Sequence, residues 1–442
     1  MKKLTLILIC IFIFLLTGCQ SEGTLPDDKT PPVNSSNVGE NDPGSNTPNN
    51  RPANPSNNPT GIDTTGFQKE MNVQHPFRLR AACKTEAGYY FNNEGLLYFL
   101  DGATGNVTVV CGRPECDHKG NDCNAWVNTS MLSYYQGKLY YVNADAKSDS
   151  MKTLYSVELD GTNHTKIQRL QLEFKPYWTV LSDPILTNGN VYFLEGDSQI
   201  YTVKLGEDVS KAVLVFEDDM SHTLESSWKF WADGGEVYAM NHILDNTGYN
   251  QDILYRLGAA QSETREIWRS TGLEKNISLS SWYITNGHLY YYFPGSDLWD
   301  IVLGTGYTKK VIDLKDTVKS GTALFTDSYF ILLDDQPDSQ WGVQGGFREG
   351  GEKITVYDYS GNLMSEVSLS PIFEAYSDAV HCSPVFADGT NVYLLVDRGA
   401  YMSTSNLLYR IDWEKGNMIE ATNWPGADVI YEDTPPMEFV IG

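Results

Sequence analysis

The sequence predicts an all-β fold: a seven-bladed β-propeller of four-stranded antiparallel blades, preceded by a signal segment and a disordered linker. After residue 60 the chain has almost no helical periodicity, and its apolar residues alternate or cluster in short runs between Gly, Asp and Asn turns. One pair of strand-like segments recurs seven times, at intervals of roughly 40–60 residues, which is the repeat length of propeller blades.

The first segment of each pair is an aromatic-rich strand that follows a Gly or polar turn. Its seven copies are Gly88–Phe91, Gly137–Tyr141, Gly189–Phe193, Gly235–Tyr238, Gly287–Tyr291, Asp327–Phe330 and Gly389–Tyr393. The sixth copy lacks the Gly and is the most divergent.

The second segment is an aliphatic and aromatic strand, often closed by a polar turn. Its copies are Leu97–Phe99, Leu154–Val157, Ile200–Val203, Leu254–Leu257, Leu298–Ile301, Val356–Tyr359 and Leu408–Ile411. A small sheet of this kind cannot cover both of its faces alone, and closure into a ring packs those faces against neighbouring sheets. We therefore expect the repeated aromatic residues to fill the space between blades.

The repeated pair resembles the blades of TolB-like propellers and of uncharacterised surface lipoproteins of Gram-positive bacteria, over residues 80–423. The resemblance implies the propeller fold. It implies no particular activity, because propellers carry many unrelated functions.

The N-terminal segment predicts export from the cytoplasm. Lys2 and Lys3 precede an apolar run from residue 4 to residue 16, and the run ends in Leu16-Thr17-Gly18-Cys19. A positive start and a short apolar stretch before small residues form a secretory signal. Its ending is similar to a bacterial lipobox, which implies that Cys19 carries lipid and becomes the first mature residue. We expect an extracytoplasmic protein that is lipid-anchored to the bacterial cell membrane and contacts it through the anchor alone.

Three regions follow from composition: residues 1–19 as signal peptide and lipobox, 20–60 as a linker, and 61–442 as the propeller domain. The linker is rich in Asn, Pro and Ser, and it has too little apolar surface to offset the entropy of ordering. The formal charge of the chain is −25, so nucleic acid is a poor partner. A protein or a neutral glycan remains as the expected partner.

Cys111, Cys116, His118 and Cys123 lie close together in one segment between two repeats. Disulfides are the first expectation in an oxidising compartment. Zinc held by three Cys and one His is the alternative, and zinc is the one cofactor that the sequence suggests. Thiol redox chemistry is a third possibility, although the spacing is not Cys-x-x-Cys.

Five cysteines remain once Cys10 leaves with the signal and Cys19 is lipidated, and five cannot all pair within one chain. Cys382 opens a first strand at the same end of the ring as the Cys segment, whereas Cys83 lies later in its own first strand. We therefore expect Cys382 to join the cluster, as a disulfide or metal candidate, and Cys83 to remain a buried thiol.

The long connections of the chain are expected on one face of the ring. Blade topology sends the connections between second and third strands, and those between blades, to the same face, and loops on a rigid scaffold often carry function. The candidate contact residues in these loops are Trp341, Phe347, Arg348, Tyr249 and Tyr401. Exposed aromatic rings of this kind stack on sugars or anchor a partner protein.

The sequence contains no Gly-x-Ser-x-Gly elbow, His-Glu-x-x-His helix or phosphate-binding loop, and no catalytic residue is predicted from it. The expected function is a binding or scaffolding module for a protein or glycan. Two alternatives stay open. One is an extracellular polysaccharide hydrolase or lyase that uses loop carboxylates. The other is an accessory subunit for envelope assembly or sensing.

Overall fold

The structure is a computed structural model. It describes residues 79–93, 95–118, 122–127, 129, 131–144, 152–172, 183–196, 198–218, 223–245, 250–270, 281–292, 297–314, 321–334, 353–376, 379–398, 406–422 and 424. The expected signal segment, the linker and Cys19 lie outside these residues.

The described chain forms seven four-stranded sheets, which we number as blades 1–7. Blade 1 contains β1 (Leu79–Lys84), β2 (Gly88–Asn93), β3 (Leu96–Asp101) and β4 (Val107–Val109). Blade 2 contains β5 (Leu132–Tyr135), β6 (Lys138–Ala144), β7 (Lys152–Glu158) and β8 (Thr165–Arg169). Blade 3 contains β9 (Ile185–Thr187), β10 (Asn190–Glu195), β11 (Gln199–Lys204) and β12 (Val213–Glu217), with the 3₁₀ turn η1 (Val209–Lys211) before β12.

Blade 4 contains β13 (Thr223–Asp233), β14 (Glu236–Asp245), β15 (Asn250–Leu257) and β16 (Arg265–Arg269), with η3 (Gln261–Glu263) between the last two. Its first three strands are the longest among the described residues of blades 1–6. Blade 5 contains β17 (Ser281–Thr285), β18 (His288–Tyr292), β19 (Leu298–Val302) and β20 (Tyr307–Ile312). Blade 6 contains β21 (Gly321–Phe325), β22 (Tyr329–Asp334), β23 (Lys353–Asp358) and β24 (Leu363–Ser368). The short helix α2 (Ser370–Ala375) leads to blade 7, which contains β25 (Ala379–Asp388), β26 (Asn391–Arg398), β27 (Asn406–Asp412) and β28 (Asn417–Glu420).

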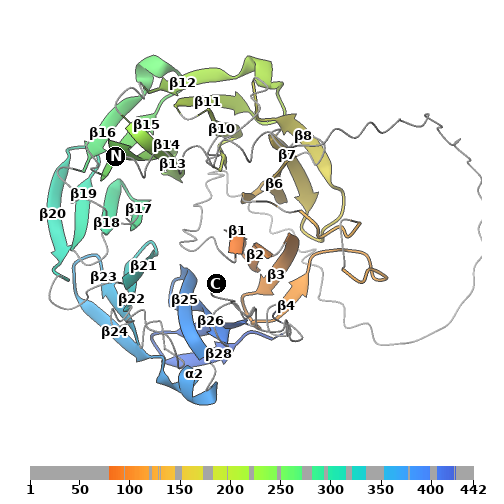
Figure 1. The fold of residues 1–442 in the computed structure, drawn as a ribbon, viewed down its shortest axis with the longest axis vertical. Helices are drawn as coiled ribbons and strands as arrows, with labels where there is room; N and C mark the ends of the chain where they lie inside the picture. Colours follow the sequence, from red (N-terminus) through yellow and green to blue (C-terminus); the bar gives the residue numbers. More distant parts are fainter. Residues whose placement is uncertain are drawn as a thin grey trace, which may run out of the picture. The chain divides into compact units, whose positions relative to one another are not determined.

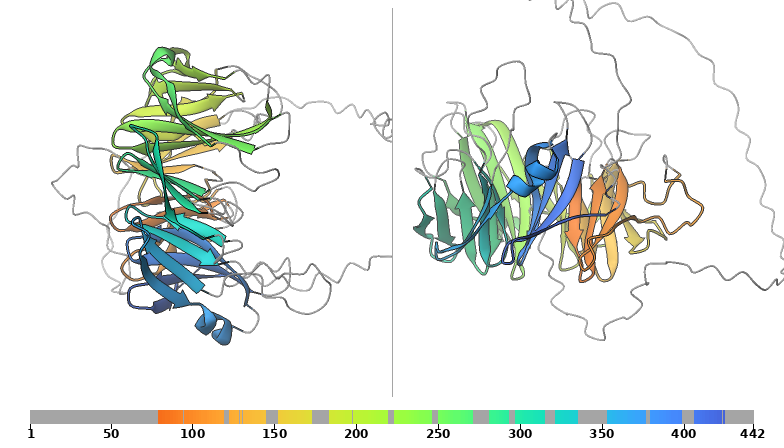
Figure 2. Two further views of the ribbon diagram at one scale, coloured as in Figure 1. Left: turned by 90° about the vertical axis from the view of Figure 1, so that its left-hand side faces the viewer. Right: turned by 90° about the horizontal axis from the view of Figure 1, so that it is seen from below.

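The strands of every blade follow one another in sequence, and all neighbouring strands within a blade are antiparallel. The sheets surround a common centre, with first strands such as β1, β17 and β25 on the inside and fourth strands such as β4, β20 and β24 on the outside (Figure 1). The side views show the blades standing next to one another around the ring (Figure 2). The predicted fold class is confirmed, and the repeated pair corresponds to the second and third strands of each blade.

Apolar side chains of adjacent blades form a shared core at each of the seven interfaces. One cluster joins blades 4, 5 and 6, and five further clusters join blades 6 and 7, 7 and 1, 1 and 2, 3 and 4, and 2 and 3. The aromatic rings of the repeated strands belong to this core, as Tyr89, Phe91 and Tyr292 show with at most 1% exposure. Burial of each such ring from water stabilises the ring closure by about 2–3 kcal/mol.

Blades 7 and 1 close the ring through packing and through the residues that follow β28. The Asp388 carboxylate accepts hydrogen bonds from Tyr89 and Lys84 across the interface. Beyond β28, the backbone N–H of Val107 donates to the carbonyl of Thr422 at 3.0 Å. Trp424 stacks on Phe91 with ring centroids 5.3 Å apart. Thr422 and Trp424 therefore fasten the end of the last blade to β4 and β2 of the first.

Among the residues that the structure describes, no helix is long and apolar enough to cross a lipid bilayer.

The closure predicts that Trp424→Ala lowers the free energy of unfolding by about 3–5 kcal/mol, because it removes a buried indole from the interface between blades 7 and 1. Thermal and denaturant unfolding of the purified chain measure this change. The control is Ile419→Ala in β28, a side chain that is 42% exposed, for which we expect a change within about 0.5 kcal/mol. Equal stability of the two variants would show that residue 424 does not fasten the ring.

Candidate metal centre

The Cys/His segment connects β4 to β5 and lies at the outer side of the ring between blades 1 and 2 (Figure 1). Its outgoing part starts at Val110, whose N–H donates to the carbonyl of Leu97 at 2.9 Å. Its returning part pairs with the start of β3, where the N–H of Leu97 donates to the carbonyl of Ala125 at 2.7 Å. Both arms of the segment are therefore held on the edge of blade 1, which brings its cysteines together.

Local turns direct the four side chains toward one point. The N–H of Cys116 donates to the carbonyl of Arg113 at 3.2 Å, which closes a turn after Cys111. His118 has a φ of 59°, in the left-handed region that few non-glycine residues adopt. The N–H of Ala125 reaches the Sγ of Cys123 at 3.4 Å. Backbone donors aimed at sulfur and a strained backbone position are both typical of a metal-binding loop.

The ligand atoms of Cys111, Cys116, His118 and Cys123 all lie within 4.8 Å of one another. The Sγ atoms of Cys111 and Cys123 are 3.7 Å apart, and the Sγ of Cys123 is 3.6 Å from Nδ1 of His118. Tetrahedral zinc, with Zn–S near 2.3 Å and Zn–N near 2.0–2.1 Å, requires separations of about 3.8 Å and about 3.6 Å for these pairs. The residues therefore fit a Cys₃His zinc site.

The disulfide expectation is not confirmed for this segment. Sulfur atoms in a disulfide lie about 2.05 Å apart, well below the separation of Cys111 and Cys123. Cys111, Cys116 and Cys123 are present as thiols. Because three thiols and one imidazole converge on one point, the arrangement matches metal coordination better than pairwise bridging.

The expectation that Cys382 joins this group is not supported by the structure. Cys382 is fully buried in β25, in the core shared by blades 6 and 7. Cys382 and the segment differ in radial position: β25 is an inner strand of blade 7, whereas the segment lies on the outer side of blades 1 and 2. Cys83 is buried, as expected, and it packs in the same apolar cluster as Cys111 and Cys123.

Burial and hydrogen bonding act in opposite directions on the two buried thiols. Burial opposes ionisation of Cys111, but hydrogen bonds from the backbone of Arg113 and from the neighbouring thiols outweigh it and lower the pKa of Cys111. Burial raises the pKa of Cys123 to about 12, and the nearby Cys111 contributes to the increase. Cys111 is therefore easier to ionise than Cys123, and a bound cation would favour ionisation of the thiols that hold it.

Sequence reasoning did not identify the groups from blade 2 that support the segment. Nδ1 of His164 lies 2.8 Å from the hydroxyl of Tyr141. Burial lowers the pKa of His164, and hydrogen bonds with the backbone of Asn124 and Gly161 partly oppose this. His164 therefore joins the returning arm of the segment to the β7–β8 turn. The only available signal was the Asp160-Gly161 turn just before it.

The five predicted contact residues of the loop face, Trp341, Phe347, Arg348, Tyr249 and Tyr401, lie outside the described residues. The topology does agree with the directional argument: the β4–β5 connection and the β22–β23 connection both leave blades at the end where second and third strands are joined. Their role as a contact surface stays a prediction.

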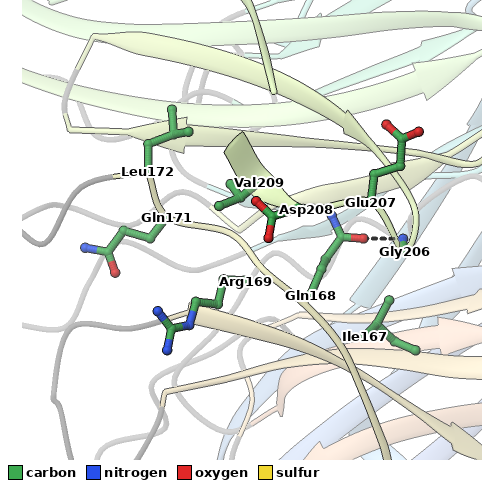
Figure 3. Close-up of a pocket in the computed structure, with 9 residues that line it drawn as sticks. All are labelled: Ile167, Gln168, Arg169, Gln171, Leu172, Gly206, Glu207, Asp208 and Val209. Carbon is green, nitrogen blue, oxygen red and sulfur yellow. Dashed lines mark hydrogen bonds between the residues drawn. The ribbon is translucent and has the colours of Figure 1, made fainter. Parts of the chain in front are cut away.

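A pocket of about 520 Å³ lies between β8 and the turn that precedes η1 (Figure 3). Two of its polar residues have structural roles. The amide oxygen of Gln168 accepts a hydrogen bond from the N–H of Gly206, and Asp208 caps η1 by accepting from the N–H of Ser210 at 2.9 Å. The bond between Gly206 and Gln168 therefore holds this turn against blade 2.

Comparisons with known proteins add similarity of fold only. No family model matches the chain, and no curated protein matches it. Among solved structures, prolyl oligopeptidase B from Galerina marginata is 13% identical with a TM-score of 0.48, over 75% of this chain and 48% of that one. Oligogalacturonate lyase from Vibrio parahaemolyticus is 10% identical with a TM-score of 0.40, over 64% and 74%. The computationally designed Ika8 protein is 10% identical with a TM-score of 0.40, over 75% and 97%. This chain thus spans about half the length of the peptidase.

A pair of glycine variants tests the contact between the segment and blade 2. Gly161 has a φ of +80°, and a Cβ there would lie 2.1 Å from the carbonyl oxygen of Val110, next to Cys111. Gly137 has nearly the same φ, +81°, but no atom within 4 Å of its Cβ position. Both Ala substitutions incur the left-handed cost of about 1–2 kcal/mol.

Only Gly161→Ala must also displace the backbone of the segment. We expect Gly161→Ala to destabilise the chain by about 1–3 kcal/mol more than Gly137→Ala, and to weaken metal binding where Gly137→Ala does not. Denaturant unfolding and a competition titration with a chromogenic zinc chelator measure the two effects. Identical behaviour of the two variants would contradict the contact.

Proposed function

We propose that this chain is a lipid-anchored extracytoplasmic propeller that serves as a binding or scaffolding module, with a structural zinc ion at Cys111, Cys116, His118 and Cys123. The observation that carries the zinc assignment is the convergence of these four ligand atoms within 4.8 Å. The propeller, with its blades packed as one ring, provides the rigid support that a binding module needs.

The ligand set favours a structural role for the zinc. A catalytic zinc ion keeps one coordination position for water or substrate, whereas a structural one is enclosed by four protein ligands. Here four side chains fill the tetrahedron, and two of them, Cys111 and Cys123, are buried. Such an ion has no position left for a substrate, and its binding free energy stabilises the fold instead.

The stabilised part is the connection between blades 1 and 2. Between the two arms that pair with blade 1, residues 112–118 contain no large aliphatic or aromatic side chain. A segment of this composition has little apolar surface to bury, so a metal ion supplies what a hydrophobic core supplies elsewhere. The zinc would thus fix the outer side of the ring where the β7–β8 turn packs.

The anchoring and the partner are supported by the sequence. The Leu16-Thr17-Gly18-Cys19 ending favours a lipid at Cys19, and the residues before position 60 provide a spacer between the anchor and the domain. The charge of −25 disfavours nucleic acid and leaves a protein or a neutral glycan as the partner class.

Metal analysis of the purified chain tests the zinc. We expect one zinc ion per chain in the wild type and none in Cys123→Ser, because loss of one thiolate opens the tetrahedron. The control is Cys382→Ala, which lies in another core cluster and should retain zinc. Chelation should lower the melting temperature of the wild type and leave that of Cys123→Ser unchanged. When the free zinc concentration is 1,000 times the Kd, zinc binding adds about 4 kcal/mol to the free energy of unfolding.

Wild-type protein that is purified without metal, or that does not respond to chelation, would exclude a structural zinc. A mass lower by two hydrogens under non-reducing conditions would instead assign a disulfide.

Partner binding is tested on an array of neutral glycans and by capture of envelope proteins from the same cell. We expect Trp341→Ala to weaken binding about 30-fold, the effect of losing an aromatic anchor of about 2 kcal/mol. Tyr307→Ala removes a ring that is 63% exposed on the outer strand β20, and it should leave binding unchanged. Equal binding by Trp341→Ala would exclude the β22–β23 loop from the contact surface.

A further inference from the structure

Blade 4 carries a row of three polar residues on one face of its sheet. Ser227 of β13 lies directly opposite His242 of β14, and His242 lies directly opposite Asp252 of β15. Residues that pair directly in an antiparallel sheet point to the same face. The row therefore places a hydroxyl, an imidazole and a carboxylate in order across three neighbouring strands.

The carboxylate end of the row is buried and fixed. Asp252 is 1% exposed. One of its carboxylate oxygens lies 2.6 Å from Nδ1 of His242, and the other accepts a hydrogen bond from the hydroxyl of Tyr291 in blade 5 at 2.7 Å. The N–H of Asp252 donates to Oγ of Ser270 at 2.8 Å. The first two contacts hold the carboxylate in one orientation, and the third fixes the backbone that carries it.

The hydrogen bond to Asp252 determines the tautomer of His242. An ionised carboxylate only accepts hydrogen bonds, so Nδ1 of His242 carries the proton that it shares with Asp252. The lone pair of the neutral ring then resides on Nε2, at the far side of the ring from Nδ1. The His242 side chain is 23% exposed, whereas that of Asp252 is 2% exposed. A buried carboxylate thus orients a base that solvent can reach.

Ser227 lies on the other side of His242 from Asp252. Directly opposed residues in an antiparallel pair have Cβ atoms about 4.5–5.5 Å apart, a separation that rotation about χ1 of serine can bridge toward an imidazole. Ser227 is half-buried, and its hydroxyl makes no hydrogen bond to another described residue. It is the one member of the row whose polar group is uncommitted within the described part of the chain.

A cation stands on the same face. Lys229 follows Ser227 by two residues on β13, so its side chain projects to the same side of the sheet, and it is exposed. The surrounding protein reduces its hydration and lowers the pKa of Lys229, while the charge of Asp252 opposes this change. The strand therefore places an ammonium group two residues along from Ser227, on the face that carries the row.

A second His–Asp pair in the ring shows what is special about blade 4. In blade 5, Nδ1 of His288 lies 2.6 Å from a carboxylate oxygen of Asp300. The residues directly opposite His288 are Thr285 and Val302, so the carboxylate of Asp300 lies diagonally from His288 and not in line with Thr285 and His288. A His–Asp pair alone can be structural. The row in blade 4 is distinguished by a carboxylate directly opposite the imidazole and by a serine in place of the threonine.

We infer that Ser227, His242 and Asp252 form a nucleophile, base and orienting carboxylate that hydrolyse short carboxylic esters. This activity goes beyond the binding role proposed above and is independent of the zinc centre. Roles of this kind are recognised by geometry and not by the order of the residues in the chain. Esters are the expected class, because an alkoxide leaves more readily than the amine of an amide.

The reaction conserves atoms and protons. Oγ of Ser227 attacks the ester carbonyl carbon, and its proton passes to Nε2 of His242. The carbon–oxygen bond to the alcohol then breaks, and the alcohol leaves with that proton, so an acyl ester remains on Ser227. Water attacks the acyl carbon, again giving a proton to His242, and the proton returns to Ser227 as the carboxylic acid departs. The sum is ester plus water to acid plus alcohol.

A fluorophosphonate probe on the full chain tests this inference. We expect covalent labelling of the wild type at Ser227, located by peptide mass spectrometry, and no labelling of Ser227→Ala. The matched control is Ser226→Ala, the neighbouring residue on the opposite face, whose hydroxyl donates to Oδ1 of Asn241 at 2.8 Å. Ser226→Ala should be labelled like the wild type.

Hydrolysis of p-nitrophenyl acetate gives the kinetic arm. His242→Ala should lower kcat by about 100-fold or more, the usual contribution of a general base. Asp252→Asn should lower kcat with little change in KM, because Asp252 positions the base and does not contact the ester. Absence of labelling at Ser227 in the folded wild type, or undiminished hydrolysis by Ser227→Ala, would overturn the inference.

Discussion

Packing between blades is the interaction on which the rest of the structure depends. A four-stranded sheet leaves two apolar faces uncovered, and in this chain each face is covered by the next blade, through to the contact of blade 7 with blade 1. Because Tyr89, Phe91 and Phe386 are almost fully buried at that last contact, the ring is closed by the same kind of core that joins its other members. The Cys/His segment and the polar row of blade 4 are both held in place by this closed core.

Because the faces of the sheets are buried in the apolar core, polar groups can gather in two other parts of a blade. One is the connections, where the β4–β5 segment gathers three thiols and an imidazole. The other is the end of a blade interface, where strands extend beyond the apolar rows. Blade 4 has long inner strands, and its Ser227–His242–Asp252 row lies beside the apolar row of Met240 and Leu254. Strand length thus provides the room for a polar row.

The sequence predicted the blades well because their signal is local. A Gly turn followed by aromatic residues at strand spacing is visible without knowledge of the partner strand, and all seven copies proved to be second strands. The Cys/His group was predicted because its members are close in sequence. Cys382 was assigned to it wrongly, because the sequence of a single strand does not show how far that strand lies from a distant segment of the ring. The pairing of His242 with Asp252 depends on the register between strands, which composition and spacing do not specify.

The choice between a disulfide and a metal illustrates the same limit, since both need cysteines at short spacing. What separates them is the fourth group. A bridge between Cys111 and Cys123 would leave Cys116 with no partner and give His118 no reason to adopt a left-handed backbone. A zinc ion uses all four side chains at once, and the observed separations of 3.7 Å and 3.6 Å match the edges of its tetrahedron. An odd number of thiols beside an imidazole is therefore better explained by coordination than by oxidation.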